Sequence, residues 1–77
     1  MDRHHTAVWA AIDRIAEHRG LTSSGLARLS GLDKTAFNLS KRTSRYGDRW
    51  PSTETIAAVL YAVDMTWAEF GRLVDSD

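Results

Sequence analysis

Residues 21–42, with the sequence LTSSGLARLSGLDKTAFNLSKR, contain the same helix-start signal twice. Thr22 and Asp33 each have a side-chain oxygen that can accept a hydrogen bond from a backbone N–H in the first turn of a following helix. A leucine precedes each of these residues, and a second apolar residue follows at the spacing of a hydrophobic staple. Gly31 stands where the first helix must stop, because glycine readily adopts the left-handed conformation found after helix C-termini. The segment therefore predicts two short helices joined by a tight turn.

These two helices, over 23–30 and 34–42, form a predicted helix-turn-helix at about 22–42. In this unit the second helix enters the DNA major groove, with its N-terminal residues toward the base edges. We therefore expect the segment 34–42 to be a recognition helix.

The formal net charge is zero, but the charges are separated along the sequence. Residues 28–49 have six basic and two acidic side chains, a net charge of +4, whereas residues 50–77 have one basic and five acidic side chains, a net charge of −4. The basic part coincides with the second helix of the predicted motif. This asymmetry favours a polyanionic partner such as DNA.

Length and composition indicate a single small domain over 1–77. The chain has 77 residues, of which 43% are hydrophobic, and it has no cysteine. One core is therefore possible, whereas a disulfide framework or a zinc–cysteine site is not. No apolar run approaches the roughly 18 residues that a membrane span requires, and the N-terminus lacks the apolar block of a signal peptide. We expect a cytoplasmic location, with His4 and His5 in a frayed, solvated end.

The remaining sequence predicts three more helices. Apolar residues recur at helical spacing from Thr6 to Arg19. A loop rich in turn formers follows the motif at 43–51. Ser52 is a good cap for the next helix, and Thr66 with Glu69 has capping-box spacing at the start of the last one. Since no segment alternates with the period of a strand, we expect an all-α fold of five short helices.

The helical periodicity also predicts the core. Ala27 is expected to be the small residue at which the helices 23–30 and 34–42 cross. The larger expected core residues are Val8, Ile12, Ile15, Leu26, Leu29, Leu32, Phe37, Ile56, Val59, Leu60, Val63, Phe70 and Leu73.

Three patterns resemble one known family. They are L-T-x-x-x-L-A-x-x-x-G-L-D-x-x-x-F-N from residue 21, R-W-P-S-T-E-T-I from residue 49 and M-T-W-x-E-F from residue 65. From about Val8 to Val74, the chain resembles the lambda-repressor-like (XRE-type) DNA-binding domains. It is most similar to the N-terminal domain of prophage-repressor regulators that carry a LexA-like peptidase domain. The resemblance implies dimeric binding to a palindromic operator and control of transcription.

The chain departs from the family pattern at the end of the predicted recognition helix. Ser40 holds a core-facing position that is usually large and apolar. Either the helix ends early, or Leu39 turns inward instead. The loop 43–51 is also longer than in the smallest members of the family.

Carried over by position, the resemblance implies base contacts from Lys34, Thr35, Asn38 and Leu39. Lysine can donate to guanine, asparagine can form two hydrogen bonds with adenine, and the other two side chains can touch a thymine methyl group. Phosphate contacts are expected from the start of the helix 23–30 and from the basic loop. The candidate residues are Ser23, Ser24, Lys41, Arg42, Arg45, Tyr46 and Arg49.

Other functions have weaker support in the sequence. We expect no enzyme and no small-molecule substrate, because no Gly-rich phosphate loop or nucleophile motif is visible. We also expect no cofactor and no metal, since His18 stands alone. An antitoxin of a toxin–antitoxin pair can use the same fold, but no added toxin-binding segment is evident. A protein-interaction module is the remaining alternative, with an aromatic docking surface made of Trp9, Trp50, Trp67 and Phe70.

Overall fold

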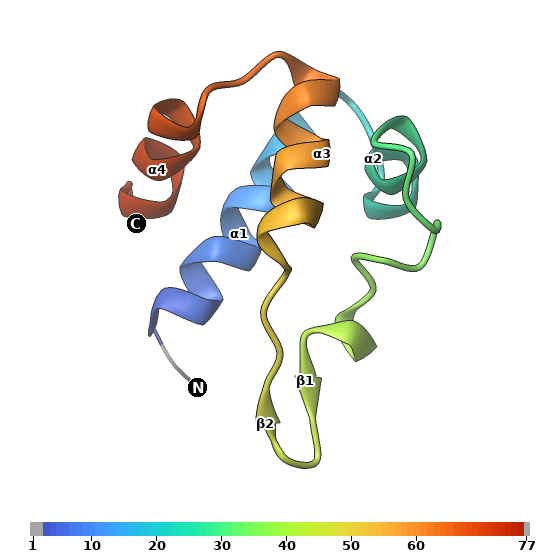
Figure 1. Ribbon diagram of the computed structural model, residues 1–77, viewed down its shortest axis with the longest axis vertical. Helices are drawn as coiled ribbons and strands as arrows, with labels where there is room; N and C mark the ends of the chain where they lie inside the picture. Colours follow the sequence, from blue (N-terminus) through green and yellow to red (C-terminus); the bar gives the residue numbers. More distant parts are fainter. Residues whose placement is uncertain (1–2, 77) are drawn as a thin grey trace.

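A computed structural model describes residues 3–76, most of which are helical (Figure 1). The elements of this part are α1 (Arg3–His18), α2 (Ser23–Leu29), the 3₁₀ helix η1 (Leu39–Lys41), β1 (Thr43–Ser44), β2 (Gly47–Asp48), α3 (Thr53–Val63) and α4 (Trp67–Asp75). A mostly helical chain is confirmed, but the prediction of five helices without a strand is wrong. Residues 1, 2 and 77 of the expected domain lie outside the described part. None of the helices between residues 3 and 76 combines the length and the apolar character needed to cross a bilayer.

Three α-helices begin at the caps that the sequence predicts. The side-chain oxygens of Thr22 and Ser52 each accept a hydrogen bond, at 3.0 Å, from the backbone N–H three residues later. At α4, Thr66 accepts from the N–H of Glu69 at 3.1 Å, and the Glu69 carboxylate accepts from the N–H of Thr66 at 3.0 Å. These N–H groups have no partner within their own helix, so the caps stabilise the helix starts. Gly31, predicted to stop the first helix of the motif, has a positive φ of 74° after α2.

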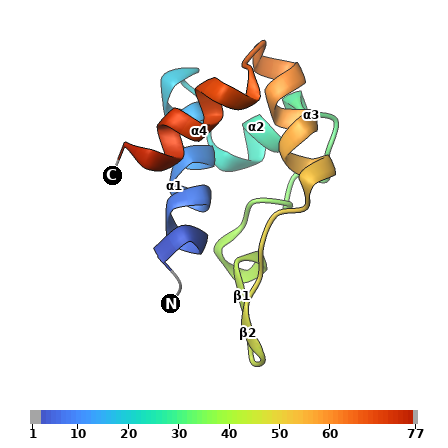
Figure 2. The ribbon, with the colours of Figure 1, turned by 60° about the vertical axis from the view of Figure 1, so that its left-hand side comes forward.

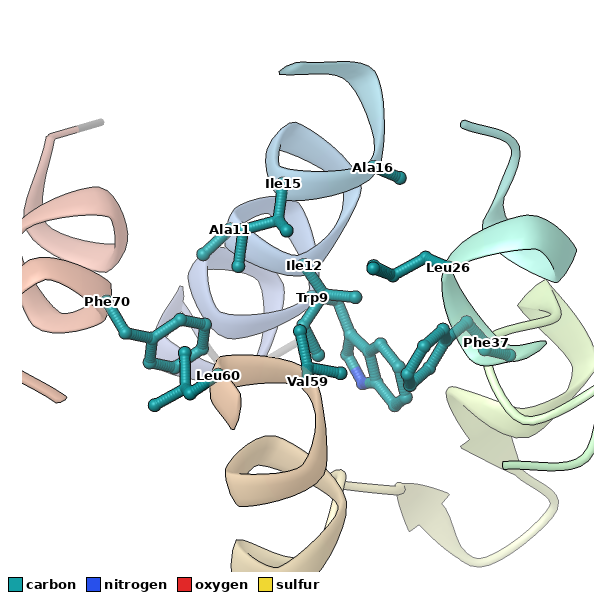
Figure 3. Packing of buried hydrophobic residues seen from close by; sticks show 11 residues of the cluster. Trp9, Ala11, Ile12, Ile15, Ala16, Leu26, Phe37, Val59, Leu60 and Phe70 are labelled. Atoms are coloured by element: carbon teal, nitrogen blue, oxygen red, sulfur yellow. The ribbon is translucent and has the colours of Figure 1, made fainter. Parts of the chain in front are cut away.

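The core lies where α1 packs against α2 and α4 and where α3 packs against α2, and Phe37 closes it on the α2 side (Figure 3). Seven predicted core residues are buried: Ile12, Ile15, Leu26, Phe37, Val59, Leu60 and Phe70. Five more are partly buried and pack against them: Val8, Leu32, Ile56, Val63 and Leu73. Ala27 is fully buried as expected, whereas the prediction for Leu29 is wrong, since half of its surface is exposed.

The segment 34–42, predicted to be a recognition helix, is not an α-helix. Residues 34–37 form a single turn with hydrogen bonds between residues three apart. Asn38 then has an extended ψ of 149°, and η1 covers only three residues. Leu39 is exposed rather than turned inward. Of the two outcomes considered for this segment, the helix therefore ends early.

The hydrogen bonds of the Phe37 carbonyl explain this break. In a continuous α-helix, this oxygen would accept from the N–H of Lys41. It accepts instead from Nε and Nη2 of Arg42, at 3.2 and 2.8 Å. The N–H of Lys41 turns to the carbonyl of Asn38, at 2.9 Å. Because Phe and Asn are only moderate helix formers, local preference is too weak to oppose this arrangement.

Residues 43–48, expected to lie in a loop, form a β-hairpin that projects away from the helices (Figures 1 and 2). Its strands are antiparallel, with Ser44 opposite Gly47. The Ser44 hydroxyl accepts from the N–H of Tyr46 at 3.2 Å and donates to the Gly47 carbonyl at 3.3 Å. Gly47 has a φ of 129°, which other residues rarely adopt. Each strand has only two residues, so no alternation of apolar and polar residues could reveal it.

Helix α1 begins at Arg3, three residues earlier than predicted. His4 and His5 therefore lie in its first turn rather than in a frayed end. His4 is exposed, but His5 is only 1% exposed, so the expectation of a solvated side chain is wrong for His5.

Candidate nucleic-acid interface

Four cations between residues 34 and 49 are exposed: Lys34, Lys41, Arg45 and Arg49. Among residues 3–76, none of these four side chains has an acidic partner within ion-pair distance. The exposed acidic residues of the C-terminal half lie on α3 and α4 or directly after α3: Glu54, Asp64, Glu69 and Asp75. The charge separation along the sequence is therefore also a separation between structural elements, and the four cations are available to an external anion.

Arg42 differs from these four cations because its charge is used within the protein. Its guanidinium forms a two-point ion pair with Asp13 on α1, at 2.8 and 2.7 Å. It also donates to the Phe37 carbonyl and lies over the Trp9 ring, 4.7 Å from the centroid. The side chain is only 12% exposed. Arg42, a predicted phosphate contact, thus attaches the basic segment to α1.

Thr35 is bound to the residue that precedes the turn. Its backbone N–H and its hydroxyl both donate to Oδ1 of Asp33, at 2.8 and 2.6 Å. The hydroxyl and then the N–H of Thr35 are the main causes that lower the pKa of Asp33, with smaller contributions from the charges of Lys41 and Lys34. Asp33 thus acts as the predicted cap, but it caps a single turn rather than a helix. Because the hydroxyl of Thr35 is bound to Asp33, only its methyl group can contact a base.

Four of the predicted contact residues line one shallow groove between α1, α2 and the segment before β1: Ser23, Asn38, Leu39 and Arg42. The groove also includes the carboxylates of Asp13 and Glu17. Asp13 is neutralised by Arg42, but the carboxylate of Glu17 makes the groove less favourable for a phosphate. Ser24 does not line this groove. The side chains of Asn38 and Leu39 are exposed.

The tip of the hairpin carries Arg45 and Tyr46. Tyr46 is 89% exposed. The guanidinium carbon of Arg45 lies 5.4 Å from the centre of the Tyr46 ring, a cation–π arrangement. The hairpin therefore presents an aromatic ring and a cation together, away from the helices.

A buried network at the base of the hairpin was missed from the sequence. Nε2 of His5 lies 2.7 Å from the carbonyl oxygen of Arg42 and 2.8 Å from that of Arg49. Both partners are acceptors, so Nε2 carries a proton and donates. The indole nitrogen of Trp9 lies 3.1 Å from this nitrogen and 3.0 Å from the Arg49 carbonyl. Since both ring nitrogens are donors, the indole N–H donates to the carbonyl.

This network joins the first turns of α1 to both ends of the hairpin. The N–H of Arg49 also donates to the Arg42 carbonyl, at 3.0 Å. A signal for the network was present in the sequence, because His5, Trp9 and Asp13 recur every four residues and so share one face of a helix.

The aromatic residues considered for protein docking divide into two groups. Trp9 and Phe70 are buried in the core. Trp50 and Trp67 are half-exposed, and the Trp50 ring packs edge-on against His5 with centroids 5.5 Å apart. The four residues therefore do not form one exposed surface.

Comparison with models of known protein families, with curated proteins and with solved structures found no match to this chain.

Proposed function

We propose that this chain binds double-stranded DNA and regulates transcription, as a domain of the lambda-repressor-like (XRE) type. The observation that supports this most is the row of exposed cations from Lys34 to Arg49, none of which has an acidic partner among residues 3–76. Protein surfaces usually carry interspersed charges of both signs, whereas a surface with charges of one sign attracts a partner of the opposite charge.

Phosphate binding follows from these charges. Each cation that neutralises a phosphate releases a counterion from the duplex, which favours association at low salt. We assign this role to Lys41 and Arg49, with the exposed hydroxyl of Tyr46 as a further donor, and the charge of Arg45 adds to the attraction for the duplex. Arg42 is omitted because its guanidinium is already bound to Asp13.

Base recognition is assigned to the exposed side chains of the turn and of η1. The side chains of Lys34, Asn38 and Leu39 are all exposed. They can contact guanine, adenine and a thymine methyl group, respectively. Thr35 contributes its methyl group. These residues come from a turn and a 3₁₀ helix, so their presentation differs from that of a recognition helix.

The resemblance to phage-type repressors adds that two copies bind a palindromic operator. Two half-sites contacted from one side of the duplex lie about one helical turn apart, about 34 Å. An enriched sequence with this symmetry is therefore the expected result of a binding selection.

The test is selection of bound sequences from a random duplex pool at low salt, about 50 mM. We expect enrichment of a symmetric site by the wild type and a strong reduction by Arg49→Ala. The matched control is Arg72→Ala, which removes an exposed cation from α4, outside the proposed surface. Recovery of no sequence above the input pool would contradict the proposed function and favour the docking of a protein.

A further inference from the structure

The hairpin 43–48 has the construction of an arm that is held in place at its base and active at its tip. At the base, the Arg42 and Arg49 carbonyls are bound by His5, and Trp9 donates to the second of them. These contacts come from α1, so they fix the direction of the arm relative to the helices. In Figures 1 and 2 the arm extends beyond every helix.

The tip is also arranged in advance. The hydrogen bonds of Ser44 with Tyr46 and Gly47 close the turn. The stacking of Arg45 on Tyr46 restricts a guanidinium that would otherwise sample many rotamers. Less conformational entropy is therefore lost when this group binds an acceptor.

We propose that this arm inserts Arg45 into the minor groove of duplex DNA, next to the site contacted by the segment 34–41, and that it favours A·T pairs there. The inference rests on the proposed function. A segment against the major groove has the minor groove as its neighbour across one phosphate backbone. The minor groove is only about 6 Å wide, which suits one side chain at a narrow tip better than a whole element.

The preference for A·T pairs follows from the chemistry of that groove. A·T pairs present only acceptors, adenine N3 and thymine O2, and the guanidinium has only donors. A G·C pair adds the N2 amino group of guanine, which is a donor and also fills the groove. Narrow A·T-rich grooves have a more negative potential, which further attracts arginine. The Tyr46 hydroxyl would then lie at the groove edge, near the sugar–phosphate backbone.

The test uses two duplexes of about 20 base pairs, two helical turns, which differ in one chemical group. One has a central G·C tract, and in the other every guanine of that tract is inosine, which lacks the N2 amino group. Binding is measured by fluorescence anisotropy at about 50 mM salt. We expect the wild type to bind the inosine duplex about 5–10-fold more tightly, the value of one good base contact.

Two variants distinguish a specific contact by the arm from the general attraction of positive charge to DNA. Arg45→Ala should bind both duplexes equally, because the exposed side chain is removed without a change in the core. Arg49→Ala should bind both more weakly but keep the preference for inosine, since Arg49 lies outside the tip.

Each outcome is informative. Equal binding of the two duplexes by the wild type, or an unchanged inosine preference in Arg45→Ala, would overturn the minor-groove arm while DNA binding stands. Failure of the wild type to bind either duplex would overturn the proposed function, and the arm with it.

Discussion

Replacement of His5 by alanine tests the buried network that positions the basic segment. The change removes the Nε2–H donor of the Arg42 and Arg49 carbonyls, which lie 2.7 and 2.8 Å away. It also leaves space beneath the Trp50 ring. We expect a clear loss of stability from a residue that composition alone would place in a solvated tail.

The size of this loss can be worked out from the contacts. Each carbonyl keeps one other donor, the N–H of Arg49 or the indole of Trp9, so neither oxygen becomes an orphan. Each lost hydrogen bond then costs about 1 kcal/mol. The partial cavity left by the imidazole adds about 1–2 kcal/mol. The expected total is about 3–4 kcal/mol, from a stability of roughly 4–12 kcal/mol for a chain of this size.

Urea unfolding, followed by tryptophan fluorescence, measures this loss. With an m-value of about 1 kcal/mol/M, the midpoint should fall by about 3 M. His18→Ala removes an exposed histidine from the other end of the same helix and should change the free energy of unfolding by less than about 1 kcal/mol. His5→Gln keeps an N–H donor of similar reach and should recover part of the loss. Equal midpoints for His5→Ala and His18→Ala would refute the reasoning.

Three further predictions concern other parts of the structure. Arg42→Ala should lower the free energy of unfolding by about 2–3 kcal/mol, because the Phe37 carbonyl and Asp13 lose their partner, whereas Lys41→Ala should leave the urea midpoint nearly unchanged. Glu69→Gln should be less stable than the wild type above the ordinary pKa of glutamate, because hydrogen bonds from the backbone and side chain of Thr66 lower the pKa of the folded carboxyl group. That difference in stability should disappear as the pH falls through the lowered pKa of the folded state. A difference that stays the same from roughly pH 3 to 7 would count against the carboxylate cap. Asn38→Ala should weaken binding to a selected site by about 1–3 kcal/mol and relax the preference at one base pair; equal losses on the selected and a scrambled duplex would remove Asn38 from the base contacts.

The parts of the fold that could be predicted are those decided by neighbouring residues. The caps at Thr22, Ser52 and Thr66 depend on hydrogen bonds across three residues, and all three are present. The apolar periodicity of α1 and α3 likewise identifies most of the core.

The segment 34–42 could not be predicted in this way, because its conformation depends on a competition for one oxygen. The Phe37 carbonyl is taken by Arg42, and Arg42 is itself held by Asp13, 29 residues away in sequence. No local pattern encodes that three-part arrangement. The helical spacing of His5 and Trp9 is visible in the sequence, but the carbonyl partners of His5 are not, since they lie 37 and 44 residues along the chain.

The charge pattern predicted a segment with exposed cations, but it did not predict the contacts of each side chain in that segment. The basic segment is exposed as its charge suggested, but Arg42 is engaged internally and Thr35 is bound to Asp33. The net charge of a segment can be predicted even when its local structure is predicted wrongly, whereas the role of one side chain depends on the direction in which it points.

The most direct test of the account is the salt dependence of binding to duplex DNA. If Lys34, Lys41, Arg45 and Arg49 all meet phosphates or the groove, a plot of log K against log salt should have a slope of about −3.6, at about −0.9 per neutralised charge. Affinity should then fall by about 100-fold between about 50 and 200 mM salt. A slope near zero, or no binding at the lowest salt, would contradict the claim that this exposed basic segment is a DNA-binding surface.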